Sequence, residues 1–240
     1  MNARPRAVGL LIGATVVATA CSELTESPTS QRTTMTAALD QASIASVVTD
    51  PAGDAAWNLN TGPGSAAKAP DYLDIVRAEV SKTAGRFVFT LDLAAPVPND
   101  PSSDPSLPSN LDHIGWEYGI DADTTTFPVG YPFEPGSANL AEFYLGVNWN
   151  PTGSFGLGMG FDAFVIDRRP LLQGGDAVTT PVDFSIEGTR LTIVVKATLI
   201  GDPTTFRWIA FSHYCKEAHP KCKVVLLDVA PSDFNLVLWP

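Results

Sequence analysis

The sequence predicts an all-β protein, an antiparallel two-sheet β-sandwich of jelly-roll type in a single domain. Three observations support this prediction. Short runs of β-branched and aromatic residues recur between clusters of Pro, Gly, Asn and Asp. Several runs alternate apolar and polar residues with a period of two, as half-buried strands do. No long segment has a convincing helical period. About nine or ten strands are therefore expected, which suits two packed sheets.

The alternation is clearest in two segments. In residues 86–93 the apolar side chains at 87, 89, 91 and 93 share one face, and in residues 113–121 those at 114, 116, 118 and 120 do. Further strands are expected at residues 72–81, 142–149, 154–166, 182–186, 190–198, 206–214 and 223–229. Turn residues at 150–153 and 187–189 indicate hairpins. Residues 35–48 are expected to form either a short amphipathic helix or a linker.

The N-terminus has the features of a bacterial lipoprotein signal peptide. Arg4 and Arg6 precede an apolar run at residues 7–17 that is too short to span a bilayer. The segment Ala18-Thr19-Ala20-Cys21 resembles a lipobox, which implies cleavage after residue 20 and lipid on Cys21. The alternative is an ordinary A-x-A signal site with an incidental Cys21. We expect an exported lipoprotein, anchored in membrane lipid at the outer membrane or cell surface.

The predicted organisation is a signal peptide at residues 1–20, a lipidated tether at residues 21–45 and a β-sandwich domain at residues 46–240. The tether is predicted because residues 22–34 are rich in Ser, Thr and Glu and have little to bury. Removal of Arg4 and Arg6 with the signal peptide changes the formal net charge from -11 to -13. Such an acidic chain lacks the basic footprint of a nucleic-acid-binding protein.

With Cys21 assigned to lipid, Cys215 and Cys222 remain as an even pair. An exported chain can oxidise them, so a disulfide that closes a hairpin is predicted. The spacing of His213, Cys215, His219 and Cys222 offers a zinc site as the alternative. The oxidising compartment and the unusual spacing favour the disulfide, with two solvent-facing histidines.

The first acidic motif runs from Asp50 to Asp54 around Gly53 and is followed, after a Gly- and Pro-rich loop, by Asp74-Ile75. Carboxylates and carbonyls gathered by a glycine turn suit Ca²⁺. These motifs, the strand at 86–93 and Ile120-Asp121-Ala122-Asp123 resemble the glucodextranase C-terminal-like, family-nine carbohydrate-binding and DOMON-like sandwiches. The resemblance implies a calcium site at Asp50, Asp54 and Asp74, although Ala55 stands where that group often has another acid. The alternative is that Asp50 and Asp54 make only turn hydrogen bonds.

Two further sets of residues are candidates for ligand binding. Asp121 and Asp123 are expected to share a cation or to flank a glycan, because residues i and i+2 of a strand face the same side. Tyr131, Phe133 and Trp149 are the predicted aromatic ligand platform, since sugar rings stack on flat side chains. Trp116 and Trp208 are instead expected in the core.

The leading hypothesis is a non-catalytic envelope lipoprotein that binds carbohydrate, with structural calcium and no catalytic cofactor. A second hypothesis is a structural or assembly lipoprotein that contacts other envelope proteins through a sheet edge or through the proline-rich segments 95–111 and 124–139. A hydrolase is the least supported class. The chain has no G-x-S-x-G or S-x-x-K motif, and nothing separates the pKa values of the Asp121 and Asp123 carboxyls.

Overall fold

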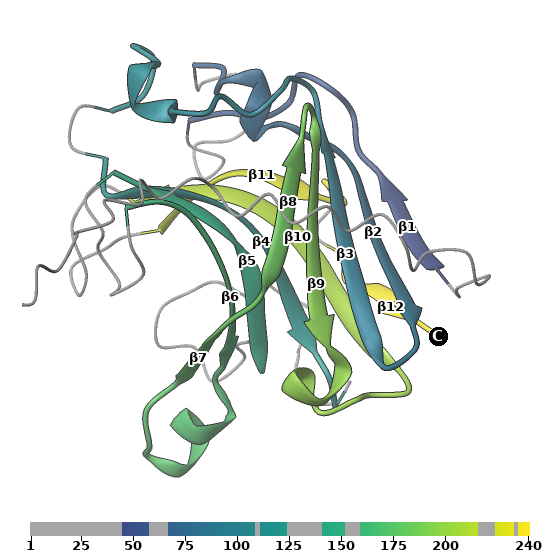
Figure 1. Ribbon diagram of the computed structural model, residues 1–240. Coiled ribbons are helices and arrows are strands. Elements are labelled where there is room, and N and C mark those ends of the chain that lie inside the picture. Colours follow the sequence, from purple (N-terminus) through teal and green to yellow (C-terminus); the bar gives the residue numbers. More distant parts are fainter. Residues whose placement is uncertain are drawn as a thin grey trace, which may run out of the picture. The chain divides into compact units, whose positions relative to one another are not determined.

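The computed structural model describes residues 45–57, 67–108, 111–123, 141–151, 159–215, 224–232 and 235–240. Within these ranges the chain forms two sheets in which all strand pairs are antiparallel, so the predicted all-β sandwich is confirmed (Figure 1). All described residues belong to the compact unit Thr34–Pro240. The helical elements among them are short 3-10 turns: η2 (Asp71–Leu73), η3 (Pro101–Ser103), η5 (Arg169–Gln173) and η6 (Ala197–Ile200).

The first sheet has five strands in the order β1-β2-β3-β9-β8. Its strands are β1 (Ala45–Thr49), β2 (Ile75–Thr83), β3 (Arg86–Leu93), β9 (Arg190–Lys196) and β8 (Asp183–Glu187). The second sheet has seven strands in the order β11-β10-β4-β5-β6-β7, with β12 also paired to β10. Its strands are β4 (His113–Asp121), β5 (Phe143–Asn150), β6 (Gly160–Asp167), β7 (Val178–Pro181), β10 (Phe206–Cys215), β11 (Val224–Ala230) and β12 (Val237–Trp239).

The main core lies between the two sheets and is rich in aromatic side chains. Phe89 of the five-stranded sheet packs against Tyr118 of the other, with ring centroids 5.1 Å apart. Trp116 and Trp208 are fully buried, as predicted, and the indole N–H of Trp116 donates to the carbonyl of Tyr72 at 2.9 Å. Complete burial of such side chains, with their polar groups paired, stabilises the sandwich by roughly 1.5–3 kcal/mol each.

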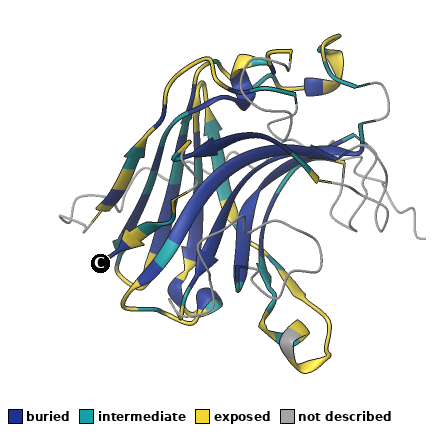
Figure 2. Ribbon diagram, turned by 180° about the vertical axis from the view of Figure 1, so that it is seen from behind, coloured by how far each residue is buried: buried dark blue, intermediate teal, exposed yellow. Residues whose placement is uncertain are grey.

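The outer face of the seven-stranded sheet, which points away from this core, is also buried. Every residue of β4 and β5 is buried, which Figure 2 shows as continuous dark blue strands. A second apolar cluster lies on this face and is formed by Ala141, Tyr144, Ile209, Phe211, Leu226 and Val229. The side chains of β4 that alternate with its core residues therefore also lie in a largely dry environment.

Most of the predicted strands are confirmed, and two match their predicted bounds, β3 and β4. Residues 45–48 belong to strand β1, so the helix or linker predicted at 35–48 is wrong there. Strands β7 and β12 were not predicted, because three or four residues show too little alternation. Gly188, with φ of 62°, makes the predicted turn between β8 and β9.

The N-terminal predictions fall outside the described residues. The signal peptide at residues 1–20, the lipid attachment at Cys21 and nearly all of the tether at residues 21–45 therefore remain predictions. Among the helices that the structure describes, none has the length and apolar character required to cross a bilayer.

Candidate functional site

Four aspartates from separate parts of the chain meet beside β2, and we call Asp50, Asp54, Asp74 and Asp228 the carboxylate cluster. Asp50 follows β1, Asp54 lies in the next turn, Asp74 precedes β2 and Asp228 lies in β11. Carboxylate oxygens of Asp50, Asp54 and Asp228 lie within 4.8 Å of one another. The sandwich therefore brings the acidic motif at the start of the domain onto one of its last strands.

Backbone N–H groups hold these carboxylates in place. The N–H of Gly53 donates to Asp74 Oδ2 at 2.5 Å, and Gly53 has φ of 90°, a conformation that favours glycine. The N–H of Ile75 donates to Asp228 Oδ2 at 2.6 Å. These bonds join the turn at residues 51–54 to the start of β2, and the start of β2 to β11.

Asp50 is bound in the same way, although its donor lies at the far end of the chain. The N–H of Ser232 donates to Asp50 Oδ1 at 2.9 Å. The carboxylate of Asp50 is thus held by a residue beyond β11 and not by the turn that follows it. This contact differs from the local turn hydrogen bond that was the alternative to a metal ligand.

The cluster places several acidic groups where water is scarce. Burial raises the pKa of Asp50 to about 6 and the pKa of Asp228 to about 8, and Asp54 adds to both increases by repulsion. Asp50 Oδ2 and Asp74 Oδ1 are buried without a hydrogen-bond partner. Lys68 lies nearby but is more than half exposed and pairs with Asp71 at 2.6 Å.

The predicted metal ligands Asp50, Asp54 and Asp74 are thus brought together, and Asp228 joins them. Sequence reasoning missed Asp228, because a single aspartate in a strand of the last fifth of the chain carries no local signal. Its position became apparent only when the pairing of β11 with β10 placed it beside Ile75.

The second acidic pair has a protein counter-charge. Asp121 Oδ2 accepts hydrogen bonds from Arg207, with Nε at 2.9 Å. Asp123 follows in the bend after β4, where Glu142 Oε2 accepts from the N–H groups of Ala122 and Asp123 at 2.8 and 3.2 Å. Oxygens of Asp121, Asp123 and Glu142 lie within 4.8 Å of one another. Arg207 and the backbone amides contact these carboxylates, and the shared cation or glycan at Asp121 and Asp123 stays a prediction.

The predicted aromatic platform is corrected at one position. Trp149 lies in β5 with 4% of its surface exposed and belongs to the main core, so it offers no free ring to a sugar. Its position shares the alternation of Leu145 and Val147, which also face the core. Tyr131 and Phe133 lie outside the described residues.

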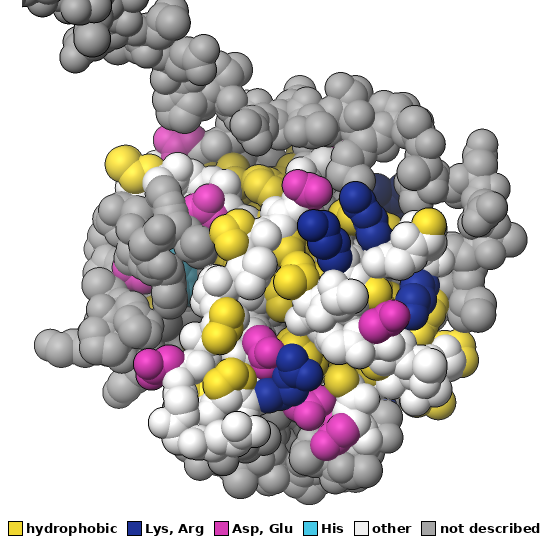
Figure 3. Space-filling model, turned by 60° about the horizontal axis from the view of Figure 1, so that its bottom comes forward, with side chains coloured by type: hydrophobic (Ala, Val, Ile, Leu, Met, Phe, Trp, Pro, Cys, Tyr) yellow, Lys and Arg dark blue, Asp and Glu magenta, His cyan; other side chains and the backbone are white. Residues whose placement is uncertain are grey.

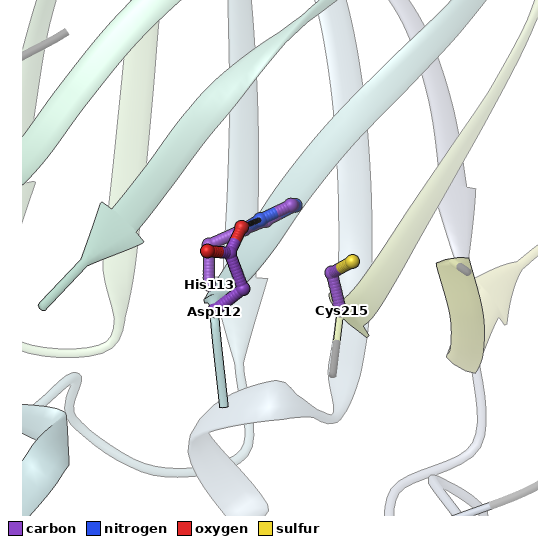
Figure 4. Close-up of side chains that lie close together, drawn as sticks. All are labelled: Asp112, His113 and Cys215. Atoms are coloured by element: carbon purple, nitrogen blue, oxygen red, sulfur yellow. Dashed lines mark hydrogen bonds and ion pairs between the residues drawn. The ribbon is translucent and has the colours of Figure 1, made fainter. Parts of the chain in front are cut away.

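A second polar cluster lies on the outer face of the seven-stranded sheet, and we call Asp112, His113, Glu117 and His213 the histidine cluster. Asp112 Oδ2 lies 3.0 Å from His113 Nδ1, and Figure 4 shows these two side chains together near Cys215. His113 Nε2 lies 3.2 Å from His213 Nε2, and His213 Nε2 lies 3.9 Å from Glu117 Oε1. The four residues form one continuous chain of polar side chains.

The prediction that His213 faces solvent is wrong, because only 2% of its surface is exposed. Alternation along β10 places His213 on the outer face with Ile209 and Phe211, which belong to the second apolar cluster. Burial lowers the pKa of His213 well below its ordinary value, and the neighbouring His113 lowers it further. Burial also raises the pKa of Glu117 to about 8.

Two glycines leave room for this cluster. A Cβ on Gly115 would lie 2.2 Å from Asn148 Oδ1 and 2.4 Å from His213 Cε1. A Cβ on Gly146 would lie 2.5 Å from the Cγ of Glu117. Glycine is therefore required at both positions if His213, Asn148 and Glu117 are to lie flat against the sheet.

Cys215 ends β10 beside this cluster and is fully buried. Oxygen, nitrogen and sulfur atoms of Asp112, His113 and Cys215 lie within 4.8 Å of one another. The sulfur is not a free thiol. Cys222 and His219 lie outside the described residues, so the disulfide between Cys215 and Cys222 remains a prediction.

Comparison with known proteins adds no family assignment. No family model matches the chain, and no curated protein matches it either.

Proposed function

We propose that this chain is an exported, calcium-stabilised β-sandwich protein that is held at a membrane through Cys21 and binds carbohydrate without catalysing a reaction. The observation that carries the proposal is the carboxylate cluster, in which the predicted acidic motif meets a fourth aspartate from β11. The sequence of the N-terminus and the acidic composition support the location outside the cytoplasm.

The residues present fit Ca²⁺ by the chemistry of their donor atoms. Ca²⁺ takes six to eight oxygen ligands and accepts carboxylates and backbone carbonyls in loose geometries. The carboxylate cluster offers oxygens alone, and two of them, Asp50 Oδ2 and Asp74 Oδ1, are buried without a partner. Asp50, Asp54 and Asp228 would hold the ion, with Asp74 beside them.

The bound ion would supply positive charge where four acids now repel one another. Its effect on the fold follows from the elements that carry the ligands. Asp50 and Asp54 follow β1, and Asp228 lies in β11, so an ion shared by them would fasten the first strand of the domain to one of its last. Calcium is therefore proposed as a structural ion.

The carbohydrate part of the proposal is supported by the family resemblance and by the remaining aromatic candidates, Tyr131 and Phe133. Non-catalytic binding is supported by the absence from the sequence of the common nucleophile motifs. An exposed ring and a neighbouring hydrogen-bonding side chain are the minimum that a sugar site needs.

Both parts can be tested on the full chain. Thermal unfolding is measured in a chelator and in excess Ca²⁺, and a panel of glycans is titrated by calorimetry under both conditions. We expect Ca²⁺ to raise the melting temperature and Asp50→Asn to abolish the rise. Tyr131→Ala should remove glycan binding without lowering the melting temperature. No calcium effect and no glycan binding together would disprove the proposal.

The second candidate function, an assembly role, is favoured by two edge strands. Among the described strands, β7 pairs only with β6 and β8 only with β9, and Val178 of β7 is 53% exposed. On the face in Figure 3, however, apolar side chains are scattered among charged and polar ones and do not form one large patch. A photo-crosslinker at Val178 that captured one defined envelope protein would favour assembly over glycan binding.

A further inference from the structure

The histidine cluster contains a pair of imidazoles whose Nε2 atoms face each other. His113 Nε2 and His213 Nε2 are 3.2 Å apart, and their rings are nearly perpendicular at 81°. Two nitrogens at this separation subtend an angle of about 100° at an ion that is about 2.0–2.1 Å from each, which is close to tetrahedral. The pair therefore already has the spacing of two ligands on one metal ion.

A hydrogen bond between the two histidines alone leaves one ring nitrogen of the pair without a partner. Because Asp112 faces His113 Nδ1 at 3.0 Å, the proton of His113 lies on Nδ1 and its Nε2 is an acceptor. His213 Nε2 must then donate to it, which leaves His213 Nδ1 as a bare acceptor. That atom is buried and has no partner. Such a group costs free energy in a protein interior.

A metal ion between the two Nε2 atoms would reverse this tautomer. His213 Nε2 would then bind the ion with its lone pair, and the proton would move to Nδ1. Asn148 Oδ1 is buried, has no partner and lies beside the same glycine, Gly115, as His213 Nδ1. The two atoms are not hydrogen-bonded to each other in this structure, so a movement of His213 or Asn148 is required before the Nδ1–H group can donate to Asn148 Oδ1 and satisfy both atoms.

Glu117 is the carboxyl group that would complete the ligand set after a movement of its side chain. Its Oε1 lies 3.9 Å from His213 Nε2, whereas two ligand atoms on a tetrahedral ion are about 3.3 Å apart. The ligand atoms of His113, His213 and Glu117 do not all lie within 4.8 Å of one another, so the Glu117 side chain must turn toward both imidazoles when the ion binds, through side-chain torsions that include its soft terminal one. The side chain is almost fully buried, and its ion-pair partner among the described residues is the imidazole of His213. Within the described part of the chain, Glu117 is thus a buried carboxyl group without a Lys or Arg counter-charge.

Asp112 has the position of a residue that orients a metal ligand. Histidines that bind metals commonly donate their other N–H to a carboxylate, which fixes the tautomer and the ring orientation. The contact between Asp112 Oδ2 and His113 Nδ1 is of this kind. Cys215 is not a free thiol, so the donor atoms on offer are two imidazole nitrogens and one carboxylate oxygen.

From this geometry we propose that His113, His213 and Glu117 bind one divalent transition-metal ion of the zinc or iron class, with Asp112 as a positioning residue. Two imidazoles with one carboxylate suit these ions, whereas Ca²⁺ prefers oxygen ligands alone. The site lies on the outer face of the seven-stranded sheet and shares no residue with the carboxylate cluster. A test of this site therefore does not depend on whether the carboxylate cluster binds Ca²⁺.

The test uses the full chain after removal of metals with a chelator. The protein is titrated with Zn²⁺ in excess Ca²⁺ and, separately, with Co²⁺, whose visible absorption reports nitrogen ligands in a low-symmetry site. We expect one equivalent of Zn²⁺ to bind. Glu117→Gln, which keeps the size of the side chain, should weaken binding by at least tenfold, and Asp112→Asn by roughly 10–100-fold.

The chain contains three histidines, so the third gives a matched control. His219→Gln should leave the zinc affinity and the cobalt spectrum unchanged, whereas His113→Gln should abolish both. If His113→Gln fails to fold, Glu117→Gln with an unchanged melting temperature in chelator still decides the question. Failure of the wild-type chain to bind Zn²⁺, unchanged affinity in Glu117→Gln, or loss of binding in His219→Gln would each overturn the proposal.

Discussion

The carboxylate cluster and the histidine cluster both contain buried acidic side chains, yet they are built in opposite ways. In the first, side chains from turns and strand ends accept hydrogen bonds from the backbone N–H groups of Gly53, Ile75 and Ser232. In the second, side chains from β4, from the residue before it and from the neighbouring strand β10 contact one another on one face of the sheet. The first cluster offers only oxygens and suits a hard ion, whereas the second offers nitrogens as well.

The largest expected effect is the selective loss of calcium stabilisation. Saturation at 100 times the dissociation constant would add about 2.7 kcal/mol to the free energy of unfolding, or about 5–10 °C in melting temperature. Asp228→Asn should abolish this rise, as seen in melting curves with and without Ca²⁺. The control is Asp71→Asn, because Asp71 is exposed and pairs with Lys68. An equal rise in wild type and Asp228→Asn would contradict the assignment.

A second prediction compares glycines from the two clusters. Gly115→Ala should lower the free energy of unfolding by about 3 kcal/mol, because its Cβ would lie 2.2 Å from Asn148 Oδ1 and 2.4 Å from His213 Cε1. Chemical denaturation in chelator measures this loss.

Gly53→Ala should cost only about 1 kcal/mol, since its φ of 90° is strained for alanine but its surroundings are open. Gly53 is thus required for its backbone conformation, and Gly115 for space. A larger loss in Gly53→Ala than in Gly115→Ala would contradict this distinction.

The smallest expected effect comes from an ion pair of the five-stranded sheet that belongs to neither cluster. Arg190 binds Asp92 through two hydrogen bonds of 2.7 and 3.1 Å between β9 and β3. Asp92→Asn should cost less than about 1 kcal/mol, because the pair is partly exposed and screened by solvent. Calcium and zinc affinities should stay unchanged in this variant.

This ion pair also predicts a pH dependence. Hydrogen bonds from Arg190 lower the pKa of Asp92 below its ordinary value of 3.8. The folded state therefore holds the ionised form more strongly than the unfolded state does, so the contribution is complete above pH 3.8 and is lost as the pH falls through the lower folded pKa. Denaturation curves of wild type and Asp92→Asn should converge in acid. A difference that grew on acidification would contradict this sign.

The two clusters also differ in how far the sequence predicted them. Asp50, Asp54 and Asp74 lie in two short acidic motifs around glycine and proline turns, so their types and spacing predicted an oxygen site. The sequence could not predict that Asp228 joins this cluster, because its contact with Ile75 depends on the position of β11 in the second sheet.

The alternation that placed Ile114 and Trp116 in the core also placed His113, Gly115 and Glu117 on the opposite face. The sequence of β4 therefore showed that His113 and Glu117 share a face. Whether that face is buried depends on what covers the sheet, and the sequence of one strand does not reveal this. The side-chain contact of His113 with His213 further requires that β4 and β10, far apart in the chain, are neighbours. Trp149 was misplaced because its proximity to a turn outweighed its alternation with Val147.

We propose that one sandwich carries two separate metal sites of different chemistry. The most direct measurement is the metal content of the full chain after dialysis against a mixture of Ca²⁺ and Zn²⁺. We predict one ion of each in the wild type, zinc alone in Asp228→Asn and calcium alone in Glu117→Gln. Loss of both ions in either variant, or a wild-type chain that retains neither, would contradict the account.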